Sequence, residues 1–241
     1  MDSGDGEALS QSNLLGLKRR TVKSFVRREG RITESQKRAF DLLMPKYCID
    51  IDQREVDLEV LFGRKAPVVL EIGFGNGESL AQQARLNPDY NFIGVEVHRP
   101  GVGQHLRRVE EFGLENVRVV CGDAFIVLEQ LLLPGSCDRI QLFFPDPWPK
   151  KRHHKRRILN PNFLQLSHNV LRQEGVLHMA TDWVPYADVA VALLQQSELF
   201  ENLGDASGCV PKPEYRVKTK FEQRGERLGH EVRDIVFGRC C

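Results

Sequence analysis

From residue 67 onward, short apolar runs alternate with longer amphipathic stretches. The short runs have the length and β-branched content of buried strands, and the longer stretches have the spacing of helices that bury one face. This alternation is typical of βαβ units, in which helices cover a mostly parallel sheet. We therefore predict strands at 68–72, 91–97, 117–121, 139–144 and 176–180, and helices at 78–86, 100–112, 124–132, 161–172 and 184–195.

The segments on either side of this alternation complete the predicted architecture. Apolar residues at 199–203 and 232–237 favour an antiparallel edge on the sheet. Thr33 and Gln36 form a capping-box pattern ahead of a helix that we expect to run to about Met44. We expect an α/β fold with a doubly wound sheet, arranged as a flexible basic and polar tail (1–21), a lead-in with a helix (22–66) and one large domain (67–241).

Composition narrows the class of protein. A chain of 241 residues with 41% hydrophobic residues can bury a sizeable core. It has no apolar run of 18 or more residues, and its acidic, polar start lacks the layout of a signal peptide. The six cysteines show no C-x-x-C spacing and no histidines at metal-ligand distance, which argues against a disulfide framework or a zinc site. We expect a cytoplasmic protein with no membrane contact and no metal.

An acidic residue stands at the end of each of the five main predicted strands. In a doubly wound sheet, ligands bind beyond the carboxyl ends of the strands, so acids in register there favour a ligand site. Asp123 has an alternative role as the cap of the helix that follows it. The five acids are Glu71, Glu96, Asp123, Asp146 and Asp182.

The first predicted turn is rich in glycine, with Gly73, Gly75 and Gly77 directly after the strand. The dinucleotide fingerprint G-x-G-x-x-G would place a third glycine at position 78, where this chain has Glu78. Acidic side chains repel a pyrophosphate, whereas they attract S-adenosylmethionine, which carries an ammonium and a sulfonium and no phosphate. The turn therefore favours S-adenosylmethionine over a nicotinamide cofactor.

The next two strand ends fit the rest of such a donor. Glu96 can accept hydrogen bonds from both ribose hydroxyls. Asp123, or the amides beside it, would lie near the adenine.

The fourth strand runs into Phe143-Phe144-Pro145-Asp146-Pro147-Trp148-Pro149. Three prolines in five residues stiffen the backbone, as an active-site wall requires. The segment resembles the Asp/Asn-Pro-Pro-aromatic loop of methyltransferases that modify planar nitrogen groups. A stiff surface turn with Trp148 packed on the core is the alternative.

Basic residues follow this loop at once. Six of the eight residues at 150–157 are Lys or Arg, and a second cluster at 18–31 has seven basic residues and one acid, although the formal net charge of the chain is only +1. A basic block beside a donor pocket is the expected footprint of a phosphate backbone. We therefore expect a nucleic acid as the methyl acceptor.

Together these motifs resemble the bacterial tRNA (guanine-N7)-methyltransferase family, over about residues 22–239. The proline-basic and Thr-Lys-Phe-Glu segments are much more specific than the glycine turn. The motifs are Leu-Glu-Ile-Gly-Phe-Gly-Asn-Gly at 70–77, Gly-Val-Glu-Val-His at 94–98, Phe-Pro-Asp-Pro-Trp-Pro-Lys-Lys-Arg-His-His-Lys-Arg-Arg at 144–157, Ala-Thr-Asp-Trp at 180–183 and Thr-Lys-Phe-Glu at 219–222.

The resemblance implies a Rossmann-like class I methyltransferase that transfers a methyl group from S-adenosylmethionine to N7 of the variable-loop guanine of tRNA, position 46, and releases S-adenosylhomocysteine. It implies no obligate protein partner, and monomer and homodimer both remain open. Carried over residue by residue, the resemblance implies that the donor is bound by the turn glycines and by Glu71, Glu96, Asp123 and Asp146, and that Asp146 also takes part in catalysis. It implies that the substrate is bound by Lys150, Asp182, Thr219, Lys220, Phe221 and Glu222. The residues that it places on the RNA are Arg152, His153, His154, Lys155, Arg156 and Arg157.

The chemistry of guanine N7 limits the mechanism. N7 carries a lone pair and no proton, so the transfer needs positioning and no general base. Asp146 could compensate charge developing on the base, or Asp146 and Asp182 could accept from guanine N–H groups while Lys150 donates to O6. Trp148 or Phe221 could stack on the base. Rival functions are methylation of another nucleic-acid base, RNA binding without catalysis, and nicotinamide-dependent oxidation.

Overall fold

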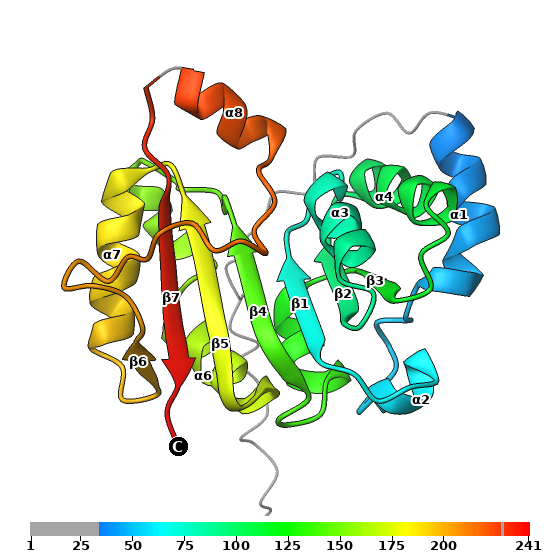
Figure 1. Cartoon of the computed structure of the whole chain (residues 1–241), viewed down its shortest axis with the longest axis horizontal. Helices are drawn as coiled ribbons and strands as arrows, with labels where there is room; N and C mark the ends of the chain where they lie inside the picture. Colours follow the sequence, from blue (N-terminus) through cyan, green and yellow to red (C-terminus); the bar gives the residue numbers. More distant parts are fainter. Residues whose placement is uncertain (1–33, 228) are drawn as a thin grey trace, which may run out of the picture.

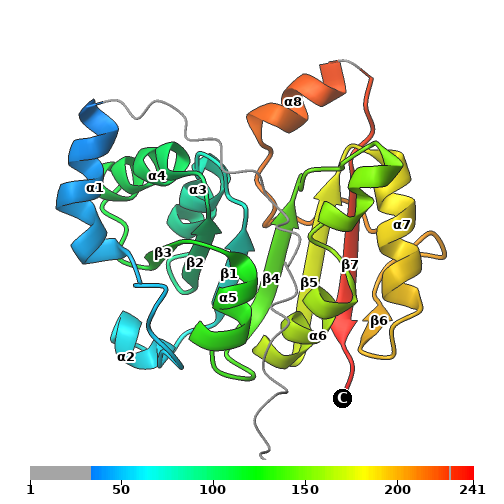
Figure 2. The same ribbon diagram turned by 180° about the vertical axis from the view of Figure 1, so that it is seen from behind.

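The computed structural model describes residues 34–227 and 229–241, which form a central sheet with helices on both faces (Figures 1 and 2). The flexible tail expected at 1–21 and the start of the lead-in lie outside the described residues. The strands are β1 (Val68–Ile72), β2 (Asn91–Glu96), β3 (Val117–Cys121), β4 (Cys137–Phe143), β5 (Leu171–Thr181), β6 (Phe200–Asn202) and β7 (Arg233–Arg239). The helices are α1 (Glu34–Tyr47), α2 (Leu58–Phe62), α3 (Glu78–Leu86), α4 (Arg99–Glu111), α5 (Ala124–Ile126), α6 (Pro161–Val170), α7 (Val184–Gln195) and α8 (Lys220–Arg227), with the π-helix η1 (Val127–Leu131) and the 3₁₀-helix η2 (Lys151–Arg156).

The strand order β3-β2-β1-β4-β5-β7-β6 is that of a doubly wound sheet with an antiparallel edge. Strands β1 to β5 are parallel to one another, β7 is antiparallel to β5, and β6 is antiparallel to β7. Both the mostly parallel sheet and the antiparallel edge predicted from the sequence are confirmed. The chain moves outward from β1 through β2 to β3 and then returns to place β4 on the other side of β1, which makes the β1–β4 junction the topological switch point.

Side chains that alternate along the strands form two cores, one on each face of the sheet. Val69 and Phe92 pack with helices α1, α3 and α4, whereas Leu70 and Ile93 pack with α6, α7 and the α5–η1 segment. On the first face, the segment between β6 and α8 crosses in front of β7 and β5 toward β4 (Figure 1). The C-terminal part of the chain therefore covers the half of that face that α3 and α4 leave free.

Three parts of the prediction differ from the structure by more than a small shift of an element's end. The helix expected at 124–132 is divided into α5 and the wider π-helix η1. The helix expected at 161–172 ends at Val170, because Leu171 is buried and already pairs with Cys137 of β4, so β5 begins five residues earlier than predicted. Helix α1 extends past Met44 to the buried Tyr47, whose hydroxyl donates to Glu110 of α4 at 2.6 Å.

Candidate active site

Two adjoining cavities lie at the carboxyl ends of β1 and β4, where the sheet has its switch point. The first, of about 430 Å³, extends toward β2 and is lined by Glu96, His98 and Trp148; we call it the β2-side cavity. The second, of about 610 Å³, extends toward α8 and is called the α8-side cavity. Four residues line both cavities, namely Gly73, Phe143, Phe144 and Asp146. The site is therefore one cleft with two ends that meet at Asp146.

The glycine turn forms the floor of this cleft with its backbone. Gly73, Gly75 and Gly77 have φ angles of 77°, 60° and 68°, which favour glycine. A Cβ on Gly73 or Gly75 would meet nothing within 4 Å, so a ligand can approach the chain closely at both. At Gly77 a Cβ would lie 2.1 Å from Nδ1 of His105, whose Nδ1–H donates to the Gly77 carbonyl at 3.0 Å. The turn thus combines backbone conformation, ligand access and close packing.

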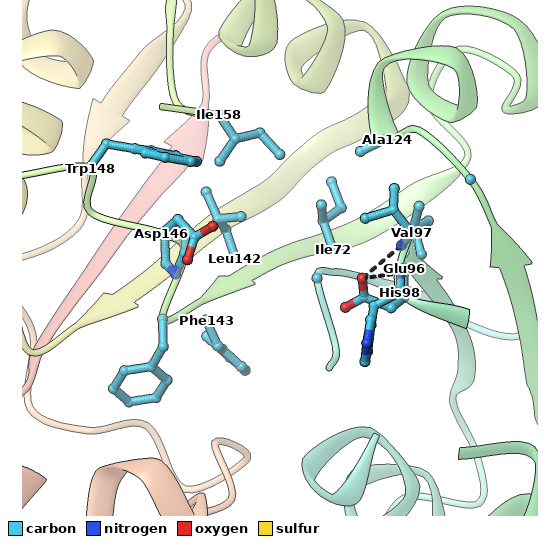
Figure 3. A pocket seen from close by; sticks show the side chains of 15 residues that line it. Ile72, Glu96, Val97, His98, Ala124, Leu142, Phe143, Asp146, Trp148 and Ile158 are labelled. Carbon is cyan, nitrogen blue, oxygen red and sulfur yellow. Dashed lines mark hydrogen bonds between the residues drawn. The ribbon is translucent and has the colours of Figure 1, made fainter. Parts of the chain in front are cut away.

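Glu96 lies at the end of β2 and is held by backbone N–H groups on both sides. Its Oε2 accepts from Gly75 at 2.9 Å, and its Oε1 accepts from Val97 at 2.7 Å and His98 at 2.8 Å. Figure 3 shows the carboxylate facing the β2-side cavity, across from Asp146 and Trp148. A carboxylate fixed in this way is ready to accept hydrogen bonds from ligand hydroxyls.

Glu71 is the buried acid of the cleft, with 3% of its surface exposed where it lines the α8-side cavity. Burial raises the pKa of its carboxyl from 4.5 to about 8, which a hydrogen bond from Gln83 Nε2 at 3.2 Å only partly opposes. Gln83 is held in turn by Gln141 of β4 at 2.9 Å. A cationic group entering the cavity would therefore favour the ionised carboxylate.

Asp123 behaves as a helix cap. Its Oδ1 accepts from the Phe125 N–H at 3.0 Å, and its neighbours Gly122 and Ala124, rather than Asp123 itself, line the β2-side cavity. The capping alternative considered from the sequence is confirmed. Contact between Asp123 and a donor stays a prediction.

The proline-rich loop has an unusual backbone on each side of Asp146. Phe144 and Trp148 have φ angles of 50° and 44°, although both are bulky and each precedes a proline, where such conformations are disfavoured. Strained residues of this kind persist where the surroundings hold them, and they cluster at functional sites. The Phe144 N–H donates to the Ala180 carbonyl at 2.7 Å, which ties the loop to β5. The loop presents an exposed Asp146 at the junction of the two cavities.

The basic residues after the loop fold back toward Trp148 as the short helix η2. The Arg156 guanidinium lies 5.1 Å from the centre of the Trp148 ring. The His153 and Trp148 rings are nearly perpendicular, with their centres 5.7 Å apart. The remaining predicted RNA contacts are exposed or half-exposed: Arg152, His154 and Lys155, with Lys150 exposed just before the helix.

Arg157 differs from its basic neighbours because it is buried, with 6% of its surface exposed. Its Nε donates to the Pro147 carbonyl at 2.9 Å, and its guanidinium lies 4.6 Å from the Tyr186 ring. The expectation that Arg157 contacts RNA is therefore corrected. Arg157 holds the proline-rich loop from inside.

The Thr-Lys-Phe-Glu segment forms a capping box at the start of α8. The Glu222 N–H donates to Thr219 Oγ1 at 3.1 Å, and the Thr219 N–H donates to Glu222 Oε2 at 3.3 Å. Thr219 also lines the α8-side cavity. Of the predicted substrate residues Lys220 and Phe221, the structure describes the backbone only.

Glu222 is buried, and its carboxylate belongs to an ion-pair network instead of an open substrate surface. Arg216 donates to it through Nη1 at 2.7 Å and Nη2 at 2.8 Å, and Nη2 also donates to Asp234 of β7 at 2.9 Å. Asp234 accepts from His178 Nε2 of β5 at 2.8 Å. The expected substrate contact of Glu222 is corrected to an anchor for the chain around Thr219. Sequence reasoning missed Arg216 because nothing in its neighbourhood marks it as buried.

Asp182 lies in the α8-side cavity together with Thr219 and His230. Of these three residues, only His230 was not predicted from the sequence. The cavity thus gathers residues from β1, from the loops after β4 and β5, and from the α8 segment.

Among the residues that the structure describes, no group of three or more His, Cys, Asp and Glu side chains could hold a metal ion, and no helix is long and apolar enough to cross a membrane.

The class of protein follows from this cleft and from its relatives. Residues 65–235 match a family described as "Putative methyltransferase". The 16S rRNA methyltransferase KamB has a similar fold, with a TM-score of 0.58 and 17% identity over 78% of this chain and 96% of that chain. The antibiotic-resistance methyltransferase Kmr gives a TM-score of 0.52 and 19% identity over 77% and 92%. The chain has the Rossmann-like methyltransferase fold predicted above.

Curated relatives define the family more narrowly. The tRNA (guanine-N(7)-)-methyltransferase of Aeromonas hydrophila is 52% identical over 91% of this chain and 93% of its own length. The enzyme of the same description from Alcanivorax borkumensis is 50% identical over 90% and 91%. This chain belongs to the tRNA (guanine-N(7)-)-methyltransferase family, as the sequence motifs indicated.

Proposed function

We propose that this protein transfers the methyl group of S-adenosylmethionine to N7 of the variable-loop guanine of tRNA, position 46, and releases S-adenosylhomocysteine. The observation that carries the proposal is the single cleft whose two ends meet at Asp146. The β2-side end has the fixed carboxylate of Glu96, and Gly73 of the open glycine turn lines both ends. The α8-side end has the acidic side chain of Asp182. Two substrates in these ends would meet beside Asp146.

The residues of the β2-side cavity fit an adenosine. Glu96 would accept from the ribose hydroxyls, with one oxygen held by the N–H groups of Val97 and His98 and the other by that of Gly75. The apolar walls and the amides beside Asp123 would hold the adenine ring. Beyond Gly73, the carboxylate of Glu71 would pair with the ammonium group of the donor, which returns its pKa toward the usual range. When bound, S-adenosylmethionine supplies a methyl group on a positively charged sulfur.

On the acceptor side the task is positioning. Guanine N7 has a lone pair and no proton, and correct orientation alone can supply roughly 7 to 11 kcal/mol of barrier reduction. Asp146, exposed between the two cavities, would compensate positive charge that develops on the base. Asp182 would accept from guanine N–H groups, with Lys150 near O6.

The basic segment would bind the RNA outside the cleft. The side chains of Arg152 and Lys155 are exposed on η2, directly after the loop that carries Asp146. Phosphate contacts there would position the tRNA without reading its sequence. The proposal needs no metal and no second protein, and it includes the expected cytoplasmic location and leaves monomer and homodimer open.

The test is to incubate the purified protein with methyl-labelled S-adenosylmethionine and, separately, unmodified tRNA, ribosomal RNA and DNA, and to identify the labelled nucleoside. The expected product is 7-methylguanosine at the variable loop of tRNA. Label in another base or another nucleic acid would replace this proposal by its alternative, a methyltransferase for a different acceptor.

A further inference from the structure

Three residues without an assigned joint role meet at one corner of the α8-side cavity. Asp182 follows β5, Gly225 lies within α8, and His230 follows that helix. His230 Nδ1–H donates to Asp182 Oδ2 at 3.3 Å, and the His230 N–H donates to the Gly225 carbonyl at 2.9 Å. The last turn of α8 therefore brings His230 directly to Asp182.

Gly225 lets α8 lie directly on the Asp182 carboxylate. A Cβ at this position would stand 3.3 Å from Asp182 Oδ2 and 3.7 Å from the His230 Cβ. The first distance is tighter than ordinary van der Waals contact, so an alanine would push the Asp182 carboxylate away by a few tenths of an ångström. The absence of a side chain at Gly225 thus sets how closely α8 approaches Asp182.

The hydrogen bond between His230 and Asp182 is poorly suited to stabilising the fold. The two side chains are 48% and 38% exposed, and an exposed pair contributes little to stability because water competes with it. Both open into the cavity, whose walls also carry the carboxyl groups of Glu71, Glu78 and Asp146. Among the cavity-lining side chains that the structure describes, His230 is the one that can carry positive charge. It is therefore placed to orient Asp182 against these acidic neighbours.

We propose that His230 and Gly225 are positioning residues of the acceptor site, which hold the Asp182 carboxylate where it accepts from the N1–H and N2–H groups of the guanine. This inference rests on the proposed function. Adenine has no N–H at its N1, so an oriented acceptor at Asp182 favours guanine over adenine. Neither residue touches the reacting atoms, and both act through Asp182.

The test compares His230→Ala, His230→Asn and Gly225→Ala with the wild type in steady-state methylation of unmodified tRNA. We expect His230→Ala to lower kcat about tenfold, the size of one hydrogen bond to a charged group. Asn can donate a similar hydrogen bond, so His230→Asn should recover much of the loss. KM for tRNA and the affinity for S-adenosylmethionine should change less than about twofold, because the basic segment and Glu96 are untouched.

Gly225→Ala separates positioning from folding. Alanine is a better helix former than glycine, so the thermal midpoint should stay the same or rise. The kcat should nevertheless fall as in His230→Ala, because the new Cβ crowds Asp182. Glu231→Ala, an exposed change next to His230, serves as the matched control and should leave kcat unaltered.

Wild-type kcat in both His230→Ala and Gly225→Ala would overturn the inference. An equal loss in the Ala and Asn variants of His230, accompanied by a lower thermal midpoint, would show a structural role and overturn it as well. If the wild type itself methylated no guanine in tRNA, the proposed function would fail, and this inference would fail with it.

Discussion

The two ends of the cleft are built in different ways. At the β2-side end, Glu96 takes its hydrogen bonds from residues on the first two strand-end turns, and glycines supply the unusual φ angles without strain. At the α8-side end, Asp182 meets His230 from a distant part of the chain, and the proline-rich loop between the two ends holds the bulky residues Phe144 and Trp148 in left-handed conformations. The groups of the donor end are positioned by the turns at the ends of the first two strands, whereas those of the acceptor end are positioned by contacts between distant segments of the chain.

The two ends should therefore respond differently to substitution. Changes at the donor end should act on the affinity for S-adenosylmethionine, since its groups are placed by short backbone connections. Changes at the acceptor end should act on the rate or on the fold, because its groups depend on buried anchors such as Arg216 and Arg157. Single substitutions at each end can separate these effects.

The largest effect is expected at the buried anchor of the acceptor end. Glu222→Ala leaves the Arg216 guanidinium buried with only Asp234 as a carboxylate partner. Removing one member of a buried ion pair costs about 3 to 5 kcal/mol, so the free energy of unfolding measured with urea should fall by that amount. Glu214→Ala, an exposed change nearby, should cost less than about 0.5 kcal/mol. Equal losses in the two variants would show that the network is not an anchor.

The next effect concerns the junction of the two ends. Asp146→Ala should lower kcat about 100- to 1,000-fold, as the removal of one group that stabilises transition-state charge does in other enzymes. Its dissociation constant for tRNA, measured by filter binding, should stay close to that of the wild type. Asp146→Asn keeps the shape and removes the charge, so it separates charge compensation from positioning. Near-normal turnover of the Ala variant would contradict the catalytic role.

A smaller, pH-dependent effect is expected at Glu71, which lines the α8-side cavity and is proposed to bind the ammonium group of the donor. Glu71 has a folded pKa of about 8 against an ordinary 4.5, so the folded state binds a proton more tightly than the unfolded state does. Wild-type stability from this group is therefore fully present below about pH 4.5 and is lost as the pH rises through about 8. Glu71→Gln has no such proton to lose. Between pH 5 and pH 8 its free energy of unfolding should gain on that of the wild type by at least about 1.4 kcal/mol, the value of one pKa unit.

The same variant checks the role of Glu71 in donor binding. S-adenosylmethionine should stabilise the wild type more than Glu71→Gln, because only the carboxylate can pair with the ammonium. Thermal shifts with and without the donor measure this difference. If the free energy of unfolding changed with pH in the same way in the wild type and in Glu71→Gln, this would contradict the buried, proton-binding state of Glu71.

The smallest effect is expected outside the cleft. Arg152→Ala combined with Lys155→Ala should weaken tRNA binding and reduce the slope of log K against log salt by about 0.7 to 0.9 for each phosphate that the two side chains no longer neutralise. Arg157→Ala is the informative comparison, because its side chain is buried on Tyr186. It should lower the thermal midpoint and leave the salt slope unchanged. A reduced slope in Arg157→Ala would restore that residue to the RNA-binding surface.

Most of the fold could be predicted from the sequence because its signals are local. The strands β1 and β3 begin and end where the apolar runs do, and the Asn and Pro residues at 160–161 mark the start of α6. The early start of β5 could not be predicted, since Leu171 is in a strand only because β4 lies beside it. The π-helix η1 likewise follows the periodicity of an ordinary helix in sequence.

The site divides in the same way. Glu71, Glu96 and the turn glycines are recognisable because the two acids lie at the ends of β1 and β2 and the glycines form the first turn. Arg157 looks like any other residue of a basic run, and only the ring of Tyr186 and the Pro147 carbonyl reveal that it is buried. His230 has no local motif at all, and its contact with Asp182 exists only once α8 is docked.

Replacing a single atom of the substrate tests whether N7 of the variable-loop guanine is the methyl acceptor. A tRNA carrying 7-deazaguanosine at position 46 keeps the Watson–Crick edge of guanine and replaces N7 by a C–H group. We predict that it binds the protein as tightly as the matched unmodified tRNA and accepts no methyl group from labelled S-adenosylmethionine. Methylation of both tRNAs at the same rate would contradict the proposed function, because the methyl group would then go to an atom other than N7 of this guanine.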